Sequence, residues 1–462
     1  MNSPSVGSAL HPRRLGLWGA TLLALAARGL CAGGLFEASG HGDTTTGVLR
    51  ASTQYARGEC AHCHEAHAGQ DADPTLYPYA LFAGEENVCW ACHQGGVTYA
   101  ADARVGFATT PPNTPTDYYK HPVSQLFSGT TPSAHRSGEK LPGAFSGGNR
   151  HAECVDCHDP HAAANDGTPG SSTHTPGGAT GNRLSGALLG TTGIVVAAWQ
   201  GAGLPFSSAS YSLRRLTDPA TTYEWQVCFK CHSSFTTLPT FASVGSGDFT
   251  ASKITSLNAR QVKEYQDVGR AFNPNNLAYH PVTAQGRNSS IPTASFTAPW
   301  TATSTMCCSD CHTKASGAPG AAGPHGSTNM HILERPVRLR ENTHYFDPSW
   351  GENIGHDPNE LCFKCHRWQT YVQKEADPST NTGFRDGGDN LHTKHMGDFA
   401  PGATCYTCHD VHGTNKQHLI NFNLDYVTSP AGSQAGYAHA ANGGSCVVTC
   451  HGEFHDGLTY SR

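Results

Sequence analysis

Two runs of apolar residues stand out in a chain that is otherwise rich in polar and small residues. The first, Leu15–Ala27, follows the basic segment 11–14 and is too short to span a bilayer comfortably. Because small residues follow it, residues 1–32 are predicted to be an export signal. The second run, Leu188–Trp199, is β-branched and predicts a surface hairpin within the Gly-, Thr- and Ser-rich segment 162–224. No later segment is predicted to cross a membrane.

The composition argues against a large core built from side chains. Hydrophobic residues make up 37% of the 462 residues, and the chain contains 52 Gly and 28 Pro. This apolar share is low for a globular domain, and so many turn-forming residues predict long irregular connections. The net charge of −6 is spread along the chain and does not indicate nucleic-acid binding.

The cysteines form the strongest pattern in the sequence. In Cys60-Ala61-His62-Cys63-His64, two residues separate two thiols, and an imidazole follows directly. Covalent attachment of haem c needs this arrangement, because the thiols add to the two vinyl groups and the histidine binds iron from one face. The eight motifs are Cys60, Cys63 and His64; Cys89, Cys92 and His93; Cys154, Cys157 and His158; Cys228, Cys231 and His232; Cys308, Cys311 and His312; Cys362, Cys365 and His366; Cys405, Cys408 and His409; and, with one extra residue between the cysteines, Cys446, Cys450 and His451.

Eight motifs predict eight covalently attached haem c groups, each with its iron. They use 16 of the 18 cysteines. A disulfide framework would not place a histidine after every second cysteine, and zinc ribbons do not require one there. Porphyrins also supply the apolar surface that the side chains lack. The predicted fold is therefore mostly irregular coil with short α-helices around a covalent haem core, with little β-structure.

The motifs fall into four pairs. The first motif of three pairs continues to Cys-x-x-Cys-His-x-x-His, which adds the trailing histidines His67, His161 and His412. A further histidine precedes each pair: His41, His121, His280 and His395, with His392 as a rival for the last. These repeats predict four dihaem units over residues 33–115, 116–275, 276–385 and 386–462, the second with an insertion.

With these doubled motifs, the sequence resembles the multihaem c-type cytochromes of the periplasm and outer surface of metal-reducing bacteria. The resemblance covers most of the chain after the signal. It implies closely packed bis-histidine haems that conduct electrons in an exported protein, located in the periplasm, on the outer-membrane surface or outside the cell. Some members form filaments and others sit in outer-membrane conduits. The expected partners are therefore other redox proteins, haem cytochromes or further copies of the chain.

Histidine is abundant enough to give every iron two imidazoles, since the chain has 28 His and only four Met. His64 and His67 are three residues apart and project from the same side of a helical turn, so they cannot bind opposite faces of one iron. The trailing histidines are therefore predicted to reach a different haem, unless they face solvent or bond propionates. The predicted second ligands are His41, His67, His121, His161, His280, His325, His395 and His412.

The third pair departs from the pattern, because Ala315 stands where a trailing histidine would be. His325 is the nearest substitute, with His331 behind it. His151, His439 and His455 are alternatives that would displace a member of the ligand set. The remaining histidines are expected to face solvent or to bond propionates.

Two cysteines lie outside the motifs. Cys31 raises the possibility of a lipid anchor, although the residues before it form a poor lipobox. Cys307 precedes Cys308, so either can be the first attachment cysteine of the fifth motif. Cys308 is favoured because it keeps the commoner spacing, and Cys307 would then be a free thiol available for a cross-link.

Three functions remain open. An iron with imidazoles on both faces exchanges single electrons and does not readily bind substrate, so eight such sites predict an electron relay. The rival is an octahaem oxidoreductase acting on nitrogen or sulfur oxyanions at an open iron, which would involve His312 or His366 in the irregular third pair. The third is filament assembly, in which His41 binds an iron of the next subunit.

Overall fold

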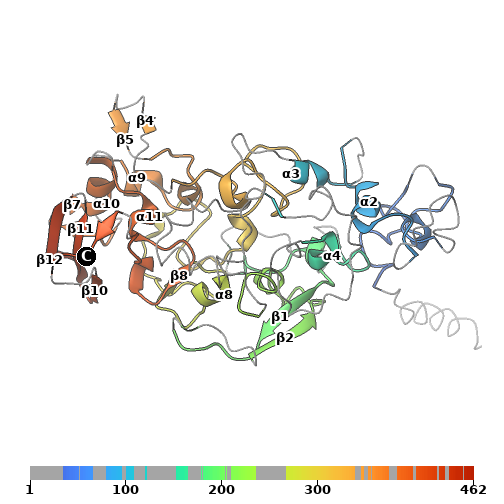
Figure 1. Cartoon of the computed structure of the whole chain (residues 1–462), viewed down its shortest axis with the longest axis horizontal. Helices are drawn as coiled ribbons and strands as arrows, with labels where there is room; N and C mark the ends of the chain where they lie inside the picture. Colours follow the sequence, from blue (N-terminus) through green and yellow to red (C-terminus); the bar gives the residue numbers. More distant parts are fainter. Residues whose placement is uncertain are drawn as a thin grey trace, which may run out of the picture.

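A computed structural model describes much of the chain. The described residues are 35–50, 53–65, 80–95, 100–108, 120–121, 152–164, 178, 180–202, 204, 210–235, 267–338, 345–347, 352–354, 356–373, 382–398, 402–423, 426–431, 436–450 and 452–461. The molecule is elongated, and the chain runs broadly from one end of the long axis to the other (Figure 1). The N-terminal elements, in blue, therefore lie at one end and the C-terminal elements, in red, at the other.

Helices are short throughout the described part, as the sequence predicts. The α-helices are α2 (Glu85–Trp90), α3 (Arg104–Ala108), α4 (Cys154–Cys157), α5 (Trp225–Cys228), α8 (Val268–Ala271), α9 (Trp368–Tyr371), α10 (Leu391–Thr393) and α11 (Cys405–Cys408), and a π-helical turn, η13 (Lys394–Asp398), follows α10. The 3₁₀ turns are η1 (Cys60–His62), η6 (Gly186–Leu188), η8 (Thr293–Ser295), η9 (Cys308–Asp310), η10 (Met330–Ile332), η11 (Leu361–Lys364) and η14 (Gln417–Leu419). Among the residues described, no helix is long and apolar enough to cross a membrane.

The strands form small antiparallel sheets. The two-stranded sheets pair β1 (Thr192–Val196) with β2 (Tyr211–Arg215), β3 (Ala278–Tyr279) with β8 (Gly413–Thr414), and β4 (Tyr345–Asp347) with β5 (Glu352–Ile354). The largest sheet runs in the order β10 (Gly436–Ala440), β11 (Gly443–Cys450), β12 (Glu453–Ser461), β6 (Arg385–Asp386) and β7 (Asp389–Asn390), and β9 (Val427–Thr428) also pairs with β11. This C-terminal sheet, which contains both cysteines of the eighth motif, departs from the expectation of little β-structure.

Strand β1 corrects the hairpin prediction. It lies inside Leu188–Trp199, but its partner β2 lies beyond that run, so the run supplies one strand only. Ile194 is fully buried and packs in a cluster with Trp225 and Phe229 of the neighbouring motif segment. Its carbonyl oxygen accepts a 3.0 Å hydrogen bond from the side chain of Gln226. Strand β1 therefore fixes the position of α5, which carries Cys228.

Truncating Ile194 tests this packing. Ile194→Ala should lower the free energy of unfolding by about 2–5 kcal/mol, because the residue is fully buried and would leave a cavity. The measurement is denaturant unfolding of the haem-loaded protein. Leu204→Ala is the matched control, since Leu204 is 55% exposed, and should change stability by less than about 0.5 kcal/mol. Equal effects of the two variants would contradict this account of the core.

Candidate functional site

Seven of the eight motifs adopt the same helical turn. In each, the backbone N–H of the histidine donates to the carbonyl oxygen of the first cysteine, at 2.8–3.0 Å. The bonds join His64 to Cys60, His93 to Cys89, His158 to Cys154, His232 to Cys228, His312 to Cys308, His366 to Cys362, and His409 to Cys405. Two residues between the cysteines make up one turn, which brings both thiols and the imidazole close together.

Reciprocal caps begin several of these turns. The N–H of Glu153 donates to the Asp156 carboxylate at 2.8 Å, and the N–H of Cys307 donates to the Asp310 carboxylate at the same distance. Both form capping boxes, which satisfy backbone donors at the start of the turn. Cys307 thus occupies the N-cap position, and Cys308 occupies the first position of the turn. The Cys307 side chain is 2% exposed, which contradicts the hypothesis of a cross-link through this thiol.

The motif histidines face a second histidine. Ring centroids lie 6.0–6.3 Å apart in seven such pairs: His64 with His161, His93 with His41, His158 with His325, His232 with His121, His312 with His412, His366 with His280, and His409 with His392.

The geometry of the pairs fits a shared metal better than aromatic stacking. A metal–imidazole bond of about 2 Å, plus about 1.1 Å from nitrogen to ring centroid, separates two opposed rings by roughly 6 Å. The centroid separations are nearly constant, whereas the angles between ring planes range from 13° to 79°. Stacking prefers particular angles. Two imidazoles on one metal axis keep their separation and can rotate about that axis.

Backbone carbonyls orient the paired imidazoles. The Nδ1 atoms of His41, His121 and His280 donate to the carbonyl oxygens of Pro160, Pro324 and Val411, at 2.8, 2.6 and 2.8 Å respectively. Each acceptor directly precedes another paired histidine: His161, His325 and His412. Because Nδ1 donates, Nε2 is left with its lone pair, as a metal ligand requires.

Hydrogen bonds from Nδ1 to backbone carbonyls also orient several motif histidines. The Nδ1 of His312 donates to the carbonyl oxygen of His331 at 2.8 Å, and the Nδ1 of His409 donates to that of His418 at 2.8 Å. His331 and His418 both have a positive φ, of 60° and 59°, which turns their carbonyls toward the motif. Their role is therefore to orient a motif histidine through the backbone.

The pairs tie each repeat to the next one. His161 trails the third motif but faces His64 of the first, and His412 trails the seventh but faces His312 of the fifth. His161 and His412 therefore each lie opposite an imidazole of a different motif, which agrees with the argument from their spacing. His325 faces His158 and so lies opposite the third motif.

The structure adds one histidine to the predicted set and corrects one hypothesis. His392 faces His409, and His395 faces His455, with centroids 6.3 and 6.2 Å apart. The sequence alone made His392 a rival of His395. Their spacing of three residues was a signal that the two histidines could face different partners. His41 faces His93 of its own chain, which contradicts the hypothesis that it binds an iron of the next subunit. Lying outside the described residues, His67, His151 and His451 stay predictions.

A continuous cavity of about 3640 Å³ connects these groups. It is lined by residues from Phe36 to Tyr460, including all 16 motif cysteines and all 16 histidines of the eight pairs named above. Protein interiors are normally close-packed, so a hollow of this size within the fold indicates a large bound group. The donor set, the ring spacing and the cavity together fit covalently attached haem c.

Neighbouring motifs adjoin in sequence order. Cysteines contact across the junctions between pairs: Cys89 with Cys154, Cys228 with Cys308, and Cys362 with Cys405. Within pairs, the side chain of Lys230 donates to the carbonyl oxygen of Asp156, and Lys364 donates to that of Asp310. The motifs therefore follow one another along the molecule without a branch at these junctions.

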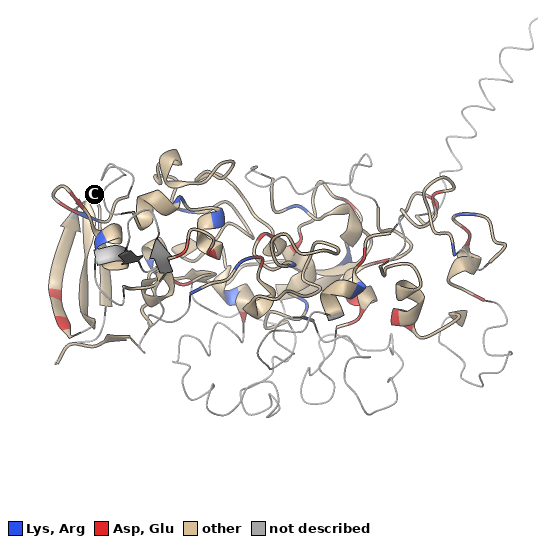
Figure 2. Ribbon diagram, turned by 90° about the horizontal axis from the view of Figure 1, so that it is seen from above, with Lys and Arg blue, Asp and Glu red and all other residues tan. Residues whose placement is uncertain are grey.

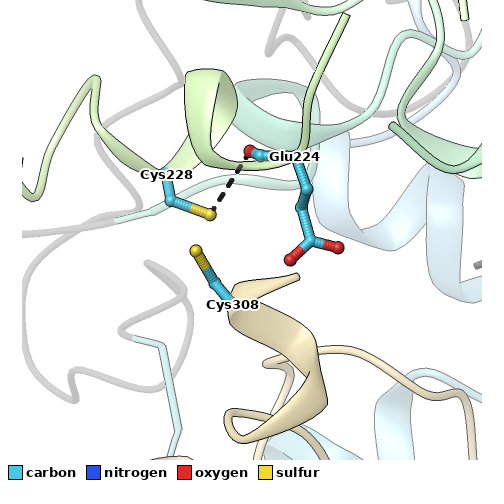
Figure 3. A group of neighbouring side chains, drawn as sticks. All are labelled: Glu224, Cys228 and Cys308. Atoms are coloured by element: carbon cyan, nitrogen blue, oxygen red, sulfur yellow. Dashed lines mark hydrogen bonds between the residues drawn. The ribbon is translucent and has the colours of Figure 1, made fainter. Parts of the chain in front are cut away.

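The junction between the fourth and fifth motifs contains a buried carboxylate. Glu224, Cys228 and Cys308 place their ligand atoms within 4.8 Å of one another (Figure 3). The Glu224 carboxylate accepts hydrogen bonds from the N–H and the hydroxyl of Ser309, at 2.8 and 2.7 Å. Burial raises the pKa of Glu224. Because both sulfurs belong to haem-attachment motifs, this group is a junction between motifs rather than a separate metal centre.

Burial keeps several of the paired imidazoles neutral. It lowers the pKa of His366 and of His392 to about 3, and that of His325 to about 4. Neutral imidazole is the form that binds a metal. His62 and His356 differ, since each is buried with both ring nitrogens hydrogen-bonded to protein groups. These two histidines therefore have a structural role.

Charged side chains do not gather into a patch on the described ribbon. Acidic and basic residues are interspersed along its length (Figure 2). A surface of this kind does not single out a partner by charge.

Comparison with known proteins supports this chemistry over the first pair. A family model described as a doubled CXXCH motif matches residues 53–98. It indicates a multihaem c-type cytochrome with covalently bound haem c and a role in electron transfer. Neither a search of curated proteins nor a search of solved structures finds a match.

The buried imidazoles predict acid sensitivity. The pKa of His366 and of His392 is about 3 in the folded chain, against 6.5 for an unperturbed histidine. Between these values the unfolded chain binds more protons than the folded chain, so stability falls as pH falls through this window, on the order of 1 kcal/mol per pH unit for each group. The denaturant midpoint should be lower at about pH 4.5 than at about pH 7. An equal midpoint at both pH values would contradict this account.

Proposed function

We propose that this chain is an exported octahaem c-type cytochrome that relays electrons through closely packed haems, each held between two imidazoles. The observation that carries the proposal is the set of seven motif histidines that each face a second histidine at 6.0–6.3 Å. With both faces covered, an iron has no position for substrate and can exchange only electrons.

The proposed attachment uses the two cysteines of each motif, with Cys308 rather than Cys307 in the fifth. Cys308 begins its turn as the first cysteine does in the other six regular motifs, and its carbonyl accepts the same bond from the motif histidine. Cys307 instead directs its thiol at the carbonyl oxygens of Gly181 and Arg183, at 3.3 and 3.5 Å. The proposed ligand pairs of the first seven irons are the seven pairs described above.

The chain's own residues set the conditions for electron exchange. The carbonyl bonds to Nδ1 make the imidazoles stronger ligands, which favours low reduction potentials. The Cys-x-x-Cys-His turns adjoin in sequence order, so the proposed relay is a single line from the first motif to the eighth. Donor and acceptor proteins would then meet the two ends of an elongated molecule (Figure 1).

The oxidoreductase alternative receives less support. For this alternative, the iron open to substrate was expected in the third motif pair, at His312 or His366. His312 faces His412 and His366 faces His280, with centroids 6.3 Å apart in both cases. Both proximal histidines therefore have an opposing imidazole where a substrate would need to bind.

Location and partners complete the proposal. The segment 1–32 is proposed to direct export, after which the protein would act in the periplasm, on the outer-membrane surface or outside the cell. Its proposed partners are other redox proteins or haem cytochromes. Assembly of copies into a filament would extend the same line, but it would require contacts other than His41.

Spin state tests the proposal most directly. The purified exported protein should carry eight haems by intact mass, and all eight irons should be low-spin in electron paramagnetic resonance. His392→Ala should convert one haem in eight to a high-spin form that binds carbon monoxide when reduced, because His409 would then lack its opposing imidazole.

His439→Ala is the control, because His439 is exposed and, among the motif histidines that the structure describes, faces none at the common separation. It should leave all eight irons low-spin. A stoichiometric high-spin haem in the unmodified protein would overturn the relay and favour an enzyme.

A further inference from the structure

We propose that two lysines set the reduction potentials of the four central haems by offsetting the charge of two aspartates. Lys230 offsets Asp156 beside the third and fourth haems. Lys364 offsets Asp310 beside the fifth and sixth. Each lysine directly precedes the second cysteine of its motif, and its side chain donates to the main-chain carbonyl oxygen of the aspartate at the same place in the preceding motif. The inference rests on the proposed function, since it concerns the potentials within that relay.

The four repeats show that the aspartate and the lysine occur together. In the second and third repeats, the residue before the second cysteine is Asp in the first motif and Lys in the second motif. In the first repeat these positions hold His62 and Ala91, and in the fourth they hold Thr407 and Thr449. His62 accepts one hydrogen bond and donates another through its ring nitrogens, as a neutral imidazole does. Within this chain, a negative charge in one turn is therefore matched by a positive charge in the turn beside it.

The aspartates are present because they cap their turns. The carboxylates of Asp156 and Asp310 each accept the N–H of the residue that begins the turn, at 2.8 Å, and close a capping box. In the fourth repeat a hydroxyl does this, since the N–H of Thr404 donates to the side chain of Thr407 at 3.1 Å. The cap thus needs an acceptor but no charge, and the repeat with the uncharged cap lacks the lysine.

Both charges of the second repeat act on the attachment cysteines of two haems. Lys230 is 5% exposed, so little water screens its charge. Burial raises the pKa of the Cys157 and Cys231 thiols. Asp156 adds to this rise and Lys230 opposes it. Because one cysteine belongs to the third motif and the other to the fourth, both haems lie within reach of the two charges.

The third repeat has the same arrangement with one addition. Burial raises the pKa of Cys311 and Cys365, Lys364 opposes the rise, and Asp310 adds to it. The ammonium of Lys364 also forms an ion pair with the carboxylate of Glu334. This second carboxylate counteracts the lysine, so the second repeat offers the cleaner test.

The sign of the effect follows from the charge of the iron. Reduction removes one positive charge, so a nearby cation favours the reduced form and raises the potential, whereas a carboxylate lowers it. An uncompensated aspartate in each central turn would make the central haems harder to reduce than their neighbours. The lysines remove this barrier in the middle of the proposed line.

Opposite substitutions test the balance in the purified, haem-loaded protein. Lys230→Met should lower the reduction potential of two haems in eight, by about tenfold in the equilibrium constant, which is about 59 mV for one electron. Asp156→Asn should raise the potential of two haems, and its amide oxygen keeps an acceptor for the cap. The double variant should return both haems toward their original potentials. Redox titration followed by haem absorbance measures all three.

Arg214→Met is the control. Arg214 is exposed and lies on β2 between Leu213 and Arg215, which line the cavity, so its side chain points to the opposite face. Removing its charge should leave all eight potentials unchanged.

Two results would overturn the proposal: no change of potential in Asp156→Asn, or shifts of the same sign in the two single variants. Asp156→Asn decides the question alone if Lys230→Met does not accumulate, because it preserves the cap. Fewer than eight haems or a high-spin haem in the unmodified protein would instead count against the proposed function. The two failures are therefore distinguishable.

Discussion

The constraint on which the rest of this structure depends is the pairing of imidazoles between repeats. His161 reaches back from the second repeat to His64 in the first, His325 reaches back to His158, and His412 reaches back to His312. A pair of motifs therefore lacks part of its own set of opposed imidazoles until the next repeat has folded against it. The result resembles a repeat protein, in which each unit is completed by its neighbour, although here the contacts converge on a hollow rather than on a side-chain core.

The fourth repeat is arranged differently from the first three. His392 and His395 both come from the short segment α10–η13, three residues apart, and they face His409 and His455. One helical segment thus supplies the two imidazoles that earlier repeats draw from separate segments. The C-terminal sheet then covers this end, and its strand β11 contains Cys446 and Cys450, which have one more residue between them than the cysteines of the other motifs.

Local spacing made part of this arrangement predictable. The positions of the motif turns followed from the cysteine pattern. The argument that histidines three apart cannot serve one iron agrees with the positions of His161 and His412, which face histidines of other motifs. The sequence did not reveal which motif each would face, because that depends on how one repeat docks on another. Nor did it predict the C-terminal sheet, whose strands are polar and glycine-rich and pair over sequence distances that no local signal records. His455 was recognised only as an alternative, since its partner is set by sheet register.

The central claim is that each opposed pair of imidazoles encloses one iron. Anomalous X-ray scattering at the iron edge, from crystals of the haem-loaded protein, would locate the irons without reference to the chain. Eight iron positions are expected, following one another along the molecule in sequence order, and the first seven should each lie between a motif histidine and its opposed imidazole. Irons displaced from these pairs, or a motif histidine opposed by open space at its iron, would contradict it.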